Sequence, residues 1–430
     1  MTWKQRHALR TFWKSALWPI PLAFMIVAPL CAHAVLDIDQ RLGWTMGLSA
    51  DGARAVASIL TGSMLTLIVF IFTVVLLAVQ VASAQFTPRV IARVFQDPGT
   101  KIALGLFVFV LTFSLVVLGR LEDPVPKLAG LSCAYGALTC VAVFVFLIDR
   151  LGKELRPVRI LTGVATEGRD VIRTIYPKLE ADTDPSSQPP DPPAMGKLTE
   201  TILHSGGPGV LLAFDDRGLL ELARDADCVI ELVPQVGDFI PPDDPLFRIY
   251  GNRGSIDRHR LAQSVAIGPE RTVEQDPAFS FRIIVDIASK ALSPAINDPT
   301  TAVLAIDQIH HLLGQVGIRQ LDTGQDCDEK GQLRLVYRTP DWEDFVQLAV
   351  TEIRHFGGES IQVARRLRAM LQTLMQTLPE SRARLLRREL DLLHRSSQRF
   401  FTEPEDLALA EIGDNQGVGG THDNRRMVVS

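Results

Sequence analysis

The sequence has few cysteines, and their spacing suggests neither a disulfide framework nor a metal site. Its 430 residues include only Cys31, Cys133, Cys140, Cys228 and Cys327, with no CxxC pair. Such scattered residues are expected to be unpaired thiols, and those in apolar stretches to act as small hydrophobic side chains. The sequence also lacks a Walker loop, GxSxG, HExxH and any His and Cys grouping at ligand spacing. We therefore expect no metal, no cofactor and no catalytic residue, and an enzyme is the least supported class.

A large excess of positive charge is absent as well. The net charge of −5 gives no reason to expect nucleic acid as a partner. Strongly apolar sequence is scarce after residue 150, whereas four apolar runs lie before it, at 16–36, 59–82, 102–119 and 129–148. Each meets or approaches the roughly 20 residues that a helix needs to cross a bilayer. The sequence predicts a bundle of four transmembrane helices in residues 1–150.

No Asp, Glu, Lys or Arg lies near the middle of any of the four runs. Ionisable residues at that depth usually mark proton relays or coupling-ion sites. Their absence disfavours a proton-coupled transporter. Four spans without an evident inverted repeat are also few for an alternating-access carrier.

Basic residues are concentrated in three of the segments that flank the runs. They are Lys4, Arg6, Arg10 and Lys14 before the first run, Arg89, Arg93 and Lys101 between the second and third, and Arg150, Lys153, Arg156 and Arg159 after the fourth. The connections on the other side carry fewer basic residues, mixed with acidic ones. The positive-inside rule then predicts a multi-pass protein with both termini in the cytoplasm.

The first run has a second interpretation. A basic start, an apolar stretch and Ala32-His33-Ala34 resemble a secretory signal with a small-x-small cleavage site. The run is longer than most signal cores, and its prolines are equally compatible with a membrane helix. Retention as a span is therefore the favoured prediction.

The second run is the most unusual, because residues 53–84 contain no proline and no ionisable residue except Arg54. One helix over this range would be longer than the bilayer is thick, so it should tilt or project beyond it. Small and polar residues recur along it at alternating spacings of four and three, together with Val69 and Leu76. We call this set the seam: Gly62, Thr66, Val69, Thr73, Leu76, Gln80 and Ser83.

Two interpretations of the seam remain open. Small residues let helix backbones approach, and hydroxyls bond neighbouring carbonyls, so the pattern alone favours helix packing. Alternatively, the hydroxyls and the amide face water in a pore and replace part of the hydration shell of an ion. The second interpretation gains weight if several copies of the chain assemble around an axis.

Beyond the fourth run the composition predicts a cytoplasmic α+β domain with several parts. These are a basic amphipathic helix over 151–180, a flexible Pro-rich linker over 181–196, an α+β region over 197–340, helical hairpins over 341–402 and a disordered tail over 403–430. Short strands are expected at 210–214, 228–233 and 246–250, with turns at 215–218 and 235–238. Helix breaks are expected at Gly357-Gly358 and near Pro379.

The densest polar pattern is RTVEQD at 271–276, followed by a helix and then ALSPAINDPTTA at 291–302. These two motifs resemble those of the DUF2254 family of predicted bacterial membrane proteins. Gln85-Phe86-Thr87-Pro88-Arg89 is similar to that family's QFSPR element, with Thr87 in place of Ser. The resemblance extends from the first apolar run to about residue 400. It implies a membrane topology and supplies no activity.

Helix capping explains much of the second motif. Asp298 can accept hydrogen bonds from free amides at a helix start, and Pro299 fits the first helical position. In the other interpretation, six side chains converge in one polar pocket that binds an ion, a nucleotide or a partner. They are Arg271, Glu274, Gln275, Asp276, Asn297 and Asp298.

The arginine-rich segment 365–399 also has two interpretations, a solvated helix face or a contact with anionic lipid headgroups. For the whole chain we predict a homo-oligomeric ion channel or pore in the bacterial inner membrane, lined by the second span and regulated or assembled by the cytoplasmic domain. Its partners would be the lipid bilayer, other copies of the chain and ions. The alternative is a membrane-anchored sensor or scaffold whose polar pocket binds a ligand or partner protein.

Overall fold

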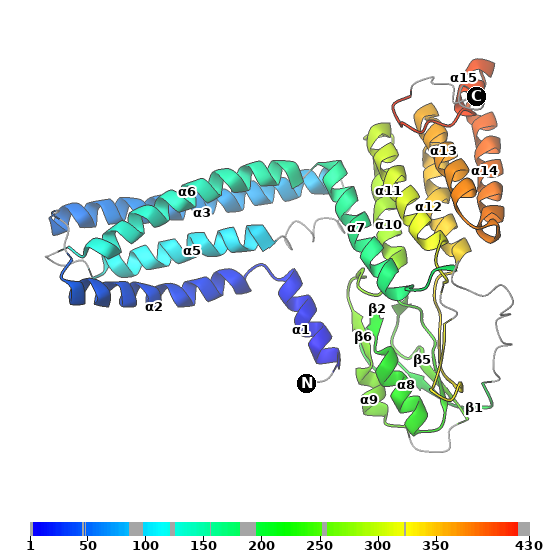
Figure 1. The fold of residues 1–430 in the computed structure, drawn as a ribbon, viewed down its shortest axis with the longest axis horizontal. Coiled ribbons are helices and arrows are strands. Elements are labelled where there is room, and N and C mark those ends of the chain that lie inside the picture. Colours follow the sequence, from blue (N-terminus) through cyan, green and yellow to red (C-terminus); the bar gives the residue numbers. More distant parts are fainter. Residues whose placement is uncertain are drawn as a thin grey trace. The chain divides into compact units, whose positions relative to one another are not determined.

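The computed structural model describes residues 3–44, 47, 49–85, 98–120, 125–154, 156–180, 195–251, 256–321 and 324–419. It divides into two compact units (Figure 1). The four-helix unit comprises Leu9–Arg159, and the mixed unit comprises Met1–Ala8 with Ile160–Ser430. The predicted QFTPR element and most of the predicted linker at 181–196 lie outside the described residues.

The predicted membrane spans are all helical. A short helix α1 (Trp3–Ser15) precedes them, and the spans are α2 (Pro19–Leu42), α3 (Ala50–Gln85), α5 (Pro98–Leu118) and α6 (Lys127–Glu154). All four are long and apolar enough to cross a membrane. The long uninterrupted second span is confirmed, because the 36 residues of α3 correspond to about 54 Å of helix.

Helix α5 is the centre of the four-helix unit. Half of its most apolar window is buried, against 28% or less in the other three spans. Close packing depends on small residues at two crossings. A Cβ at Gly105 would lie 3.1 Å from the Phe24 ring of α2, and one at Gly136 of α6 would lie 3.3 Å from Val110. Glycines therefore let both neighbouring helices approach α5 closely.

One buried carboxylate joins two spans of this unit. Asp39, in the last turns of α2, is 3% exposed. Its two oxygens accept hydrogen bonds from the backbone amides of Leu128 (2.9 Å) and Ala129 (2.8 Å), in the first turn of α6. Amides at a helix start have no partner inside the helix, so a carboxylate from another element can satisfy them. Asp39 thus fixes the start of α6 to the end of α2.

We expect Asp39→Ala to destabilise the four-helix unit by about 1–2 kcal/mol, since two buried amides lose their acceptor. Thermal unfolding in detergent measures the change. Asp37→Ala is the matched control, because Asp37 is exposed and pairs only with the exposed Arg41 in the described structure. Equal effects of the two substitutions would contradict the capping role of Asp39.

In the mixed unit, helix α7 precedes the first strand, helices are interspersed among the strands, and four helices follow the last strand. The helices are α7 (Pro157–Ile175), α8 (Asp216–Asp225), α9 (Arg258–Gln263), α10 (Pro277–Ala291), α11 (Pro299–Gly317), α12 (Trp342–Phe356), α13 (Ile361–Thr377), α14 (Glu380–Phe400) and α15 (Pro404–Ala410). The strands are β1 (Leu198–Leu203), β2 (Gly209–Phe214), β3 (Val229–Leu232), β4 (Phe239–Ile240), β5 (Pro245–Tyr250), β6 (Val265–Gly268), β7 (Gln325–Cys327) and β8 (Leu333–Tyr337).

The strands form two sheets, with strand orders β1-β5-β3-β8-β7 and β4-β2-β6. All described pairings are antiparallel except β3 with β8. The three predicted strands are confirmed as β2, β3 and β5. The predicted turn at 215–218 is only partly right, because Asp215 caps α8 there by accepting a hydrogen bond from the Gly218 amide. A connecting helix therefore follows β2 directly.

Helices α10 to α14 form the second part of this unit, at the upper end of its image in Figure 1. Helix α10 lies at its centre and packs against α11 and α12. Most of its residues are buried, including Phe281, Ile284 and Val285 at 0% exposure. The predicted helix breaks are confirmed: α12 ends before Gly357, and Pro379 is the N-cap residue of α14.

Helix α7 packs on α10 through a glycine. A Cβ at Gly168 would lie 2.7 Å from the Cβ of Ser280 and 3.5 Å from Leu312 of α11. Ser280 is fully buried in α10. Because α7 follows α6 after two residues, this contact holds the chain that leaves the fourth span against the core of the mixed unit.

We expect Gly168→Ala to destabilise the mixed unit by about 1–3 kcal/mol, because the added methyl group must separate α7 from α10. Gly314→Ala in α11 is the matched control, since its Cβ would meet nothing closer than Leu374 at 3.8 Å. That change should be neutral or stabilise by about 0.5–1 kcal/mol, as is usual for glycine to alanine in a helix. Thermal unfolding compares the two variants. A Gly168→Ala protein as stable as Gly314→Ala would exclude the close contact.

The prediction of a disordered tail is wrong for residues 404–419. The interpretation of the arginines as a solvated helix face is wrong for three arginines of α13 that contact this segment. Residues 404–410 form α15, and Asp414 is 6% exposed. Three buried arginines of α13 donate hydrogen bonds to this segment: Arg365 to the Ile412 carbonyl, Arg366 to the Asp414 carbonyl and Arg368 to the Ala410 carbonyl. On a solvated helix face these guanidinium groups would be exposed. Here they bind the chain that follows α14, as far as Gly419. Residues 420–430 lie outside the described structure.

Candidate functional sites

The seam lies on the side of α3 that faces away from the rest of the four-helix unit. Its members Gly62, Thr66, Val69, Thr73, Leu76 and Gln80 are all exposed. The buried residues of the same helix are Ala57, Thr61, Met64, Ile68, Ile71, Val75 and Ala78. At about 100° per residue these two sets lie on opposite faces. The described seam residues are therefore not part of the packing face of α3 within one chain, and the choice between packing against another copy and lining a pore stays open.

The seam hydroxyls are satisfied within the helix. Thr66 donates to the Gly62 carbonyl at 3.1 Å, and Thr73 donates to the Val69 carbonyl at 3.0 Å. A Cβ at Gly62 would meet no atom within 4 Å. Gly62 therefore lies on an exposed helix face, with no neighbouring atom where its side chain would be. Ser83 lies in α3, but its side chain is outside the described structure.

The six polar-motif residues do not converge in one pocket. Asp276 is the N-cap of α10 and Asp298 is the N-cap of α11, which starts after α10 has ended. The 15 residues of α10 between them correspond to about 22 Å of helix. The prediction of a single site is therefore wrong, since Arg271, Gln275 and Asp276 gather at one end of α10, and Asn297 and Asp298 lie beyond the other.

Arg271 and Asp276 form the core of the first group. Asp276 is 2% exposed, accepts a hydrogen bond from the Phe279 amide at 3.0 Å and is ion-paired with Arg271. The Arg271 guanidinium lies 5.3 Å from the centre of the Phe279 ring. Its other side faces Gly237, where φ is +96° and any Cβ would overlap the guanidinium. A cation held between a ring and a glycine thus connects the 235–238 turn to the start of α10.

Gln275 joins this group to the smaller sheet. Its Oε1 accepts from the Phe214 amide at 3.0 Å, and its Nε2 donates to the Phe214 carbonyl at 3.2 Å. One side chain thus imitates a strand partner for the end of β2. Glu274 takes another direction, with Oε2 lying 3.5 Å from Nδ1 of His7 in α1. The RTVEQD motif consequently contacts the sheet, the helical layer and the start of the chain.

The second group caps α11. Asp298 accepts hydrogen bonds from the Thr301 amide (3.1 Å) and hydroxyl (2.5 Å). Asn297 has a φ of +46°, which asparagine tolerates better than most residues, and it is exposed. The turn is closed by the hydrogen bond from the Asp298 amide to the Ala291 carbonyl at 2.7 Å. Capping accounts for this half of the motif.

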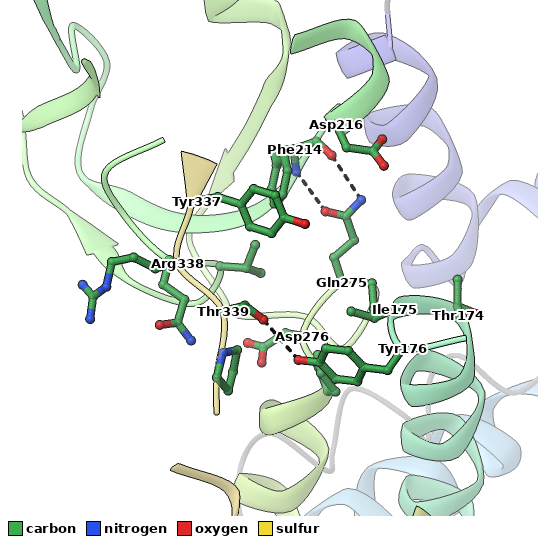
Figure 2. A pocket seen from close by; sticks show the side chains of 14 residues that line it. Thr174, Ile175, Tyr176, Phe214, Asp216, Gln275, Asp276, Tyr337, Arg338 and Thr339 are labelled. Atoms are coloured by element: carbon green, nitrogen blue, oxygen red, sulfur yellow. Dashed lines mark hydrogen bonds between the residues drawn. The ribbon is translucent and has the colours of Figure 1, made fainter. Parts of the chain in front are cut away.

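A pocket of about 160 Å³ opens beside the first group. Gln275 and Asp276 line one wall, and Tyr176, Phe214 and Tyr337 supply aromatic surface (Figure 2). The Tyr176 hydroxyl lies 3.2 Å from the Thr339 hydroxyl, and the rings of Phe214 and Tyr337 are 5.0 Å apart. The pocket is therefore amphipathic, with polar groups supplied by five separate segments.

Sequence reasoning missed the aromatic part of this pocket. The chain has only four tyrosines, and two of them, Tyr176 and Tyr337, line it. That scarcity was a usable signal, although their 161-residue separation gave no hint of proximity. Among the described residues, no group of three or more His, Cys, Asp and Glu side chains could hold a metal ion.

The buried Asp276 carboxyl makes stability depend on pH. Burial raises the pKa of Asp276 above its ordinary value of about 4, although the Arg271 guanidinium and the Phe279 amide act in the opposite direction. The folded state then holds the proton more tightly than the unfolded state, so stability falls as the pH rises from about 4 through the folded pKa.

Asp276→Asn keeps a capping side chain and removes this titration. We expect the melting temperature of the parent, relative to that of the variant, to decline between pH 4 and 7. Thermal unfolding across that range measures the difference. If the melting temperature of the parent instead rises relative to that of the variant as the pH rises, the ion pair with Arg271 outweighs the cost of burying the carboxylate.

Comparisons with known proteins agree with a membrane assignment. A family model described as a predicted membrane protein (DUF2254) matches residues 14–373. The chain is similar to the uncharacterized proteins Rv1290c of Mycobacterium tuberculosis and Mb1321c of Mycobacterium bovis. Each is 27% identical over 425 residues, which cover 94% of this chain and 80% of the relative. No solved structure matches the chain.

Proposed function

The chain belongs to the DUF2254 family of predicted membrane proteins, and in that membrane setting we propose that several copies assemble into an ion channel or pore lined by α3. The observation that carries the proposal is the exposed seam opposite the packing face of α3. Facing lipid, Gln80 would place an amide without a partner among or near acyl chains, which is costly. Facing a shared axis, the same amide and the threonine hydroxyls would meet water and ions.

The proposal includes location and orientation. We place the protein in the bacterial inner membrane with both termini in the cytoplasm, supported by the basic residues that flank the spans on one side. The mixed unit would then be cytoplasmic and would assemble or regulate the pore. Helix α7 is the structural link for such regulation, because it joins the fourth span to α10 through Gly168. We assign no catalytic step to this function.

Conduction by the purified protein in liposomes tests the proposal. We expect an ion flux, and we expect Thr73→Leu to change conductance or ion selectivity, because it replaces a hydroxyl that would line the pore with a bulkier apolar group. Thr139→Leu in α6 is the matched control. Thr139 is also an exposed threonine whose hydroxyl donates to the carbonyl four residues earlier, at 2.8 Å. Its replacement should leave the flux unchanged.

Assembled protein in a bilayer that stays impermeable to ions would contradict the channel. Equal changes in flux for Thr73→Leu and Thr139→Leu would contradict the seam as its lining. Gln80→Leu offers a second seam variant, since it removes the amide without adding bulk.

A second function is favoured by the pocket beside Asp276. There the four spans would only anchor a sensor or scaffold, and the amphipathic pocket would bind a small ligand or a partner segment. Residues Thr174, Ile175 and Tyr176, at the end of α7, line this pocket, so an occupant would touch the element that leads back to the fourth span. An impermeable bilayer would favour this second function.

A further inference from the structure

Helix α1 has a composition that neither proposed function uses. Its 13 residues include Lys4, Arg6, Arg10 and Lys14 and no acidic residue. Only residues 16–18 separate its end from Pro19, where the first span begins. A strongly basic helix thus lies, along the chain, directly next to a segment that crosses the bilayer.

One side of α1 carries large exposed apolar side chains. Leu9, Phe12 and Trp13 are 46%, 45% and 54% exposed, and Trp18 just after the helix is 57% exposed. The Phe12 and Trp18 rings contact each other edge to face, with centroids 5.9 Å apart. Aromatic side chains of this kind are enriched at the level of lipid headgroups, where an apolar ring and a polar edge are both satisfied.

The opposite side of α1 has a protein partner. Trp3 and His7 stack with ring centroids 5.3 Å apart, and His7 lies 3.5 Å from Glu274 of the RTVEQD motif. His7 and Leu9 are about 200° apart around the helix. The mixed unit therefore accounts for the His7 side, whereas Leu9, Phe12 and Trp13 on the other side each remain about half exposed.

We propose that α1 is an interfacial helix that binds an anionic lipid surface. Leu9, Phe12 and Trp13 lie at the boundary between headgroups and acyl chains, and the basic residues of the helix meet lipid phosphates. Basic amphipathic helices with Trp, Phe and Leu on the apolar side bind membranes in this way. An anionic bilayer complements a helix with four basic residues and no acidic one, and the adjacent span brings the helix to that surface.

The arginine-rich helix α14, the earlier candidate for lipid contact, fits less well. Its Arg387 is ion-paired with Glu380 at 2.7 Å and its Arg388 with Glu343 at 3.4 Å. Of its apolar side chains only Phe400, in the last position, is large and exposed. Helix α14 thus has ion-paired arginines and lacks the exposed apolar side of α1.

Hydrogen exchange of the full-length protein tests the proposal. The protein is reconstituted in vesicles of phosphatidylcholine alone and of equal parts phosphatidylcholine and phosphatidylglycerol. We expect backbone amides of residues 3–15 to exchange about tenfold more slowly, or slower still, in the anionic vesicles. Replacing Lys4, Arg6, Arg10 and Lys14 with Gln should remove that difference. Replacing Arg384, Arg387, Arg395 and Arg399 of α14 with Gln is the matched control and should preserve it.

Quenching of tryptophan fluorescence by brominated lipid is an independent readout. We expect the quenched component of the parent to shrink in Trp13→Phe and to persist in Trp342→Phe, because Trp342 is buried in the mixed unit. Equal exchange of α1 in neutral and anionic vesicles, or a Trp13 signal unaffected by brominated lipid, would overturn the proposal. Loss of the protection in the α14 control would assign the lipid contact to α14 instead.

Discussion

Aspartate side chains that accept hydrogen bonds from the free amides at helix starts organise both units of this protein. Asp39 reaches from the end of α2 to the first turn of α6, where its burial in the protein keeps water from those amides. Asp276 and Asp298 cap α10 and α11, two helices of the mixed unit with many buried residues. The residues that make the RTVEQD and SPAINDP motifs distinctive are largely these caps and the groups that hold them. Their first role is therefore to fix where helices begin.

With the helix starts fixed, each helix has a defined packing face. The packing face of α3 does not include the small and polar residues of the seam. Its apolar buried side contacts α5 and α6, and its glycine, threonines and glutamine lie on the other side. An ordinary surface span would show the reverse, with small and polar residues turned toward its own bundle. The proposed pore gives those residues aqueous surroundings, and the proposed lipid contact of α1 would anchor the chain just before the spans begin.

Sequence was sufficient wherever structure depends on local pattern. The four spans follow from apolar run length, the start of α11 from Asp298-Pro299, and the break between α12 and α13 from Gly357-Gly358. It was insufficient where partners lie far apart in the chain. Strand β8 pairs with β3 across about a hundred residues, and Gln275 finds Phe214 from 61 residues away. Arg365, Arg366 and Arg368 looked like a solvated face because the segment that buries them follows about 45 residues later. The residues at the two ends of α10 looked like one site because they are close in sequence. In the structure the length of α10 separates them.

The central claim is that the seam of α3 faces other copies of the chain. Disulfide cross-linking in native membranes tests it most directly, in a background without the five native cysteines. A cysteine at position 73 should form dimers between chains on oxidation, whereas one at position 139, exposed on α6, should not. Cross-linking at position 139 with none at position 73 would contradict the account, because the seam would then face lipid.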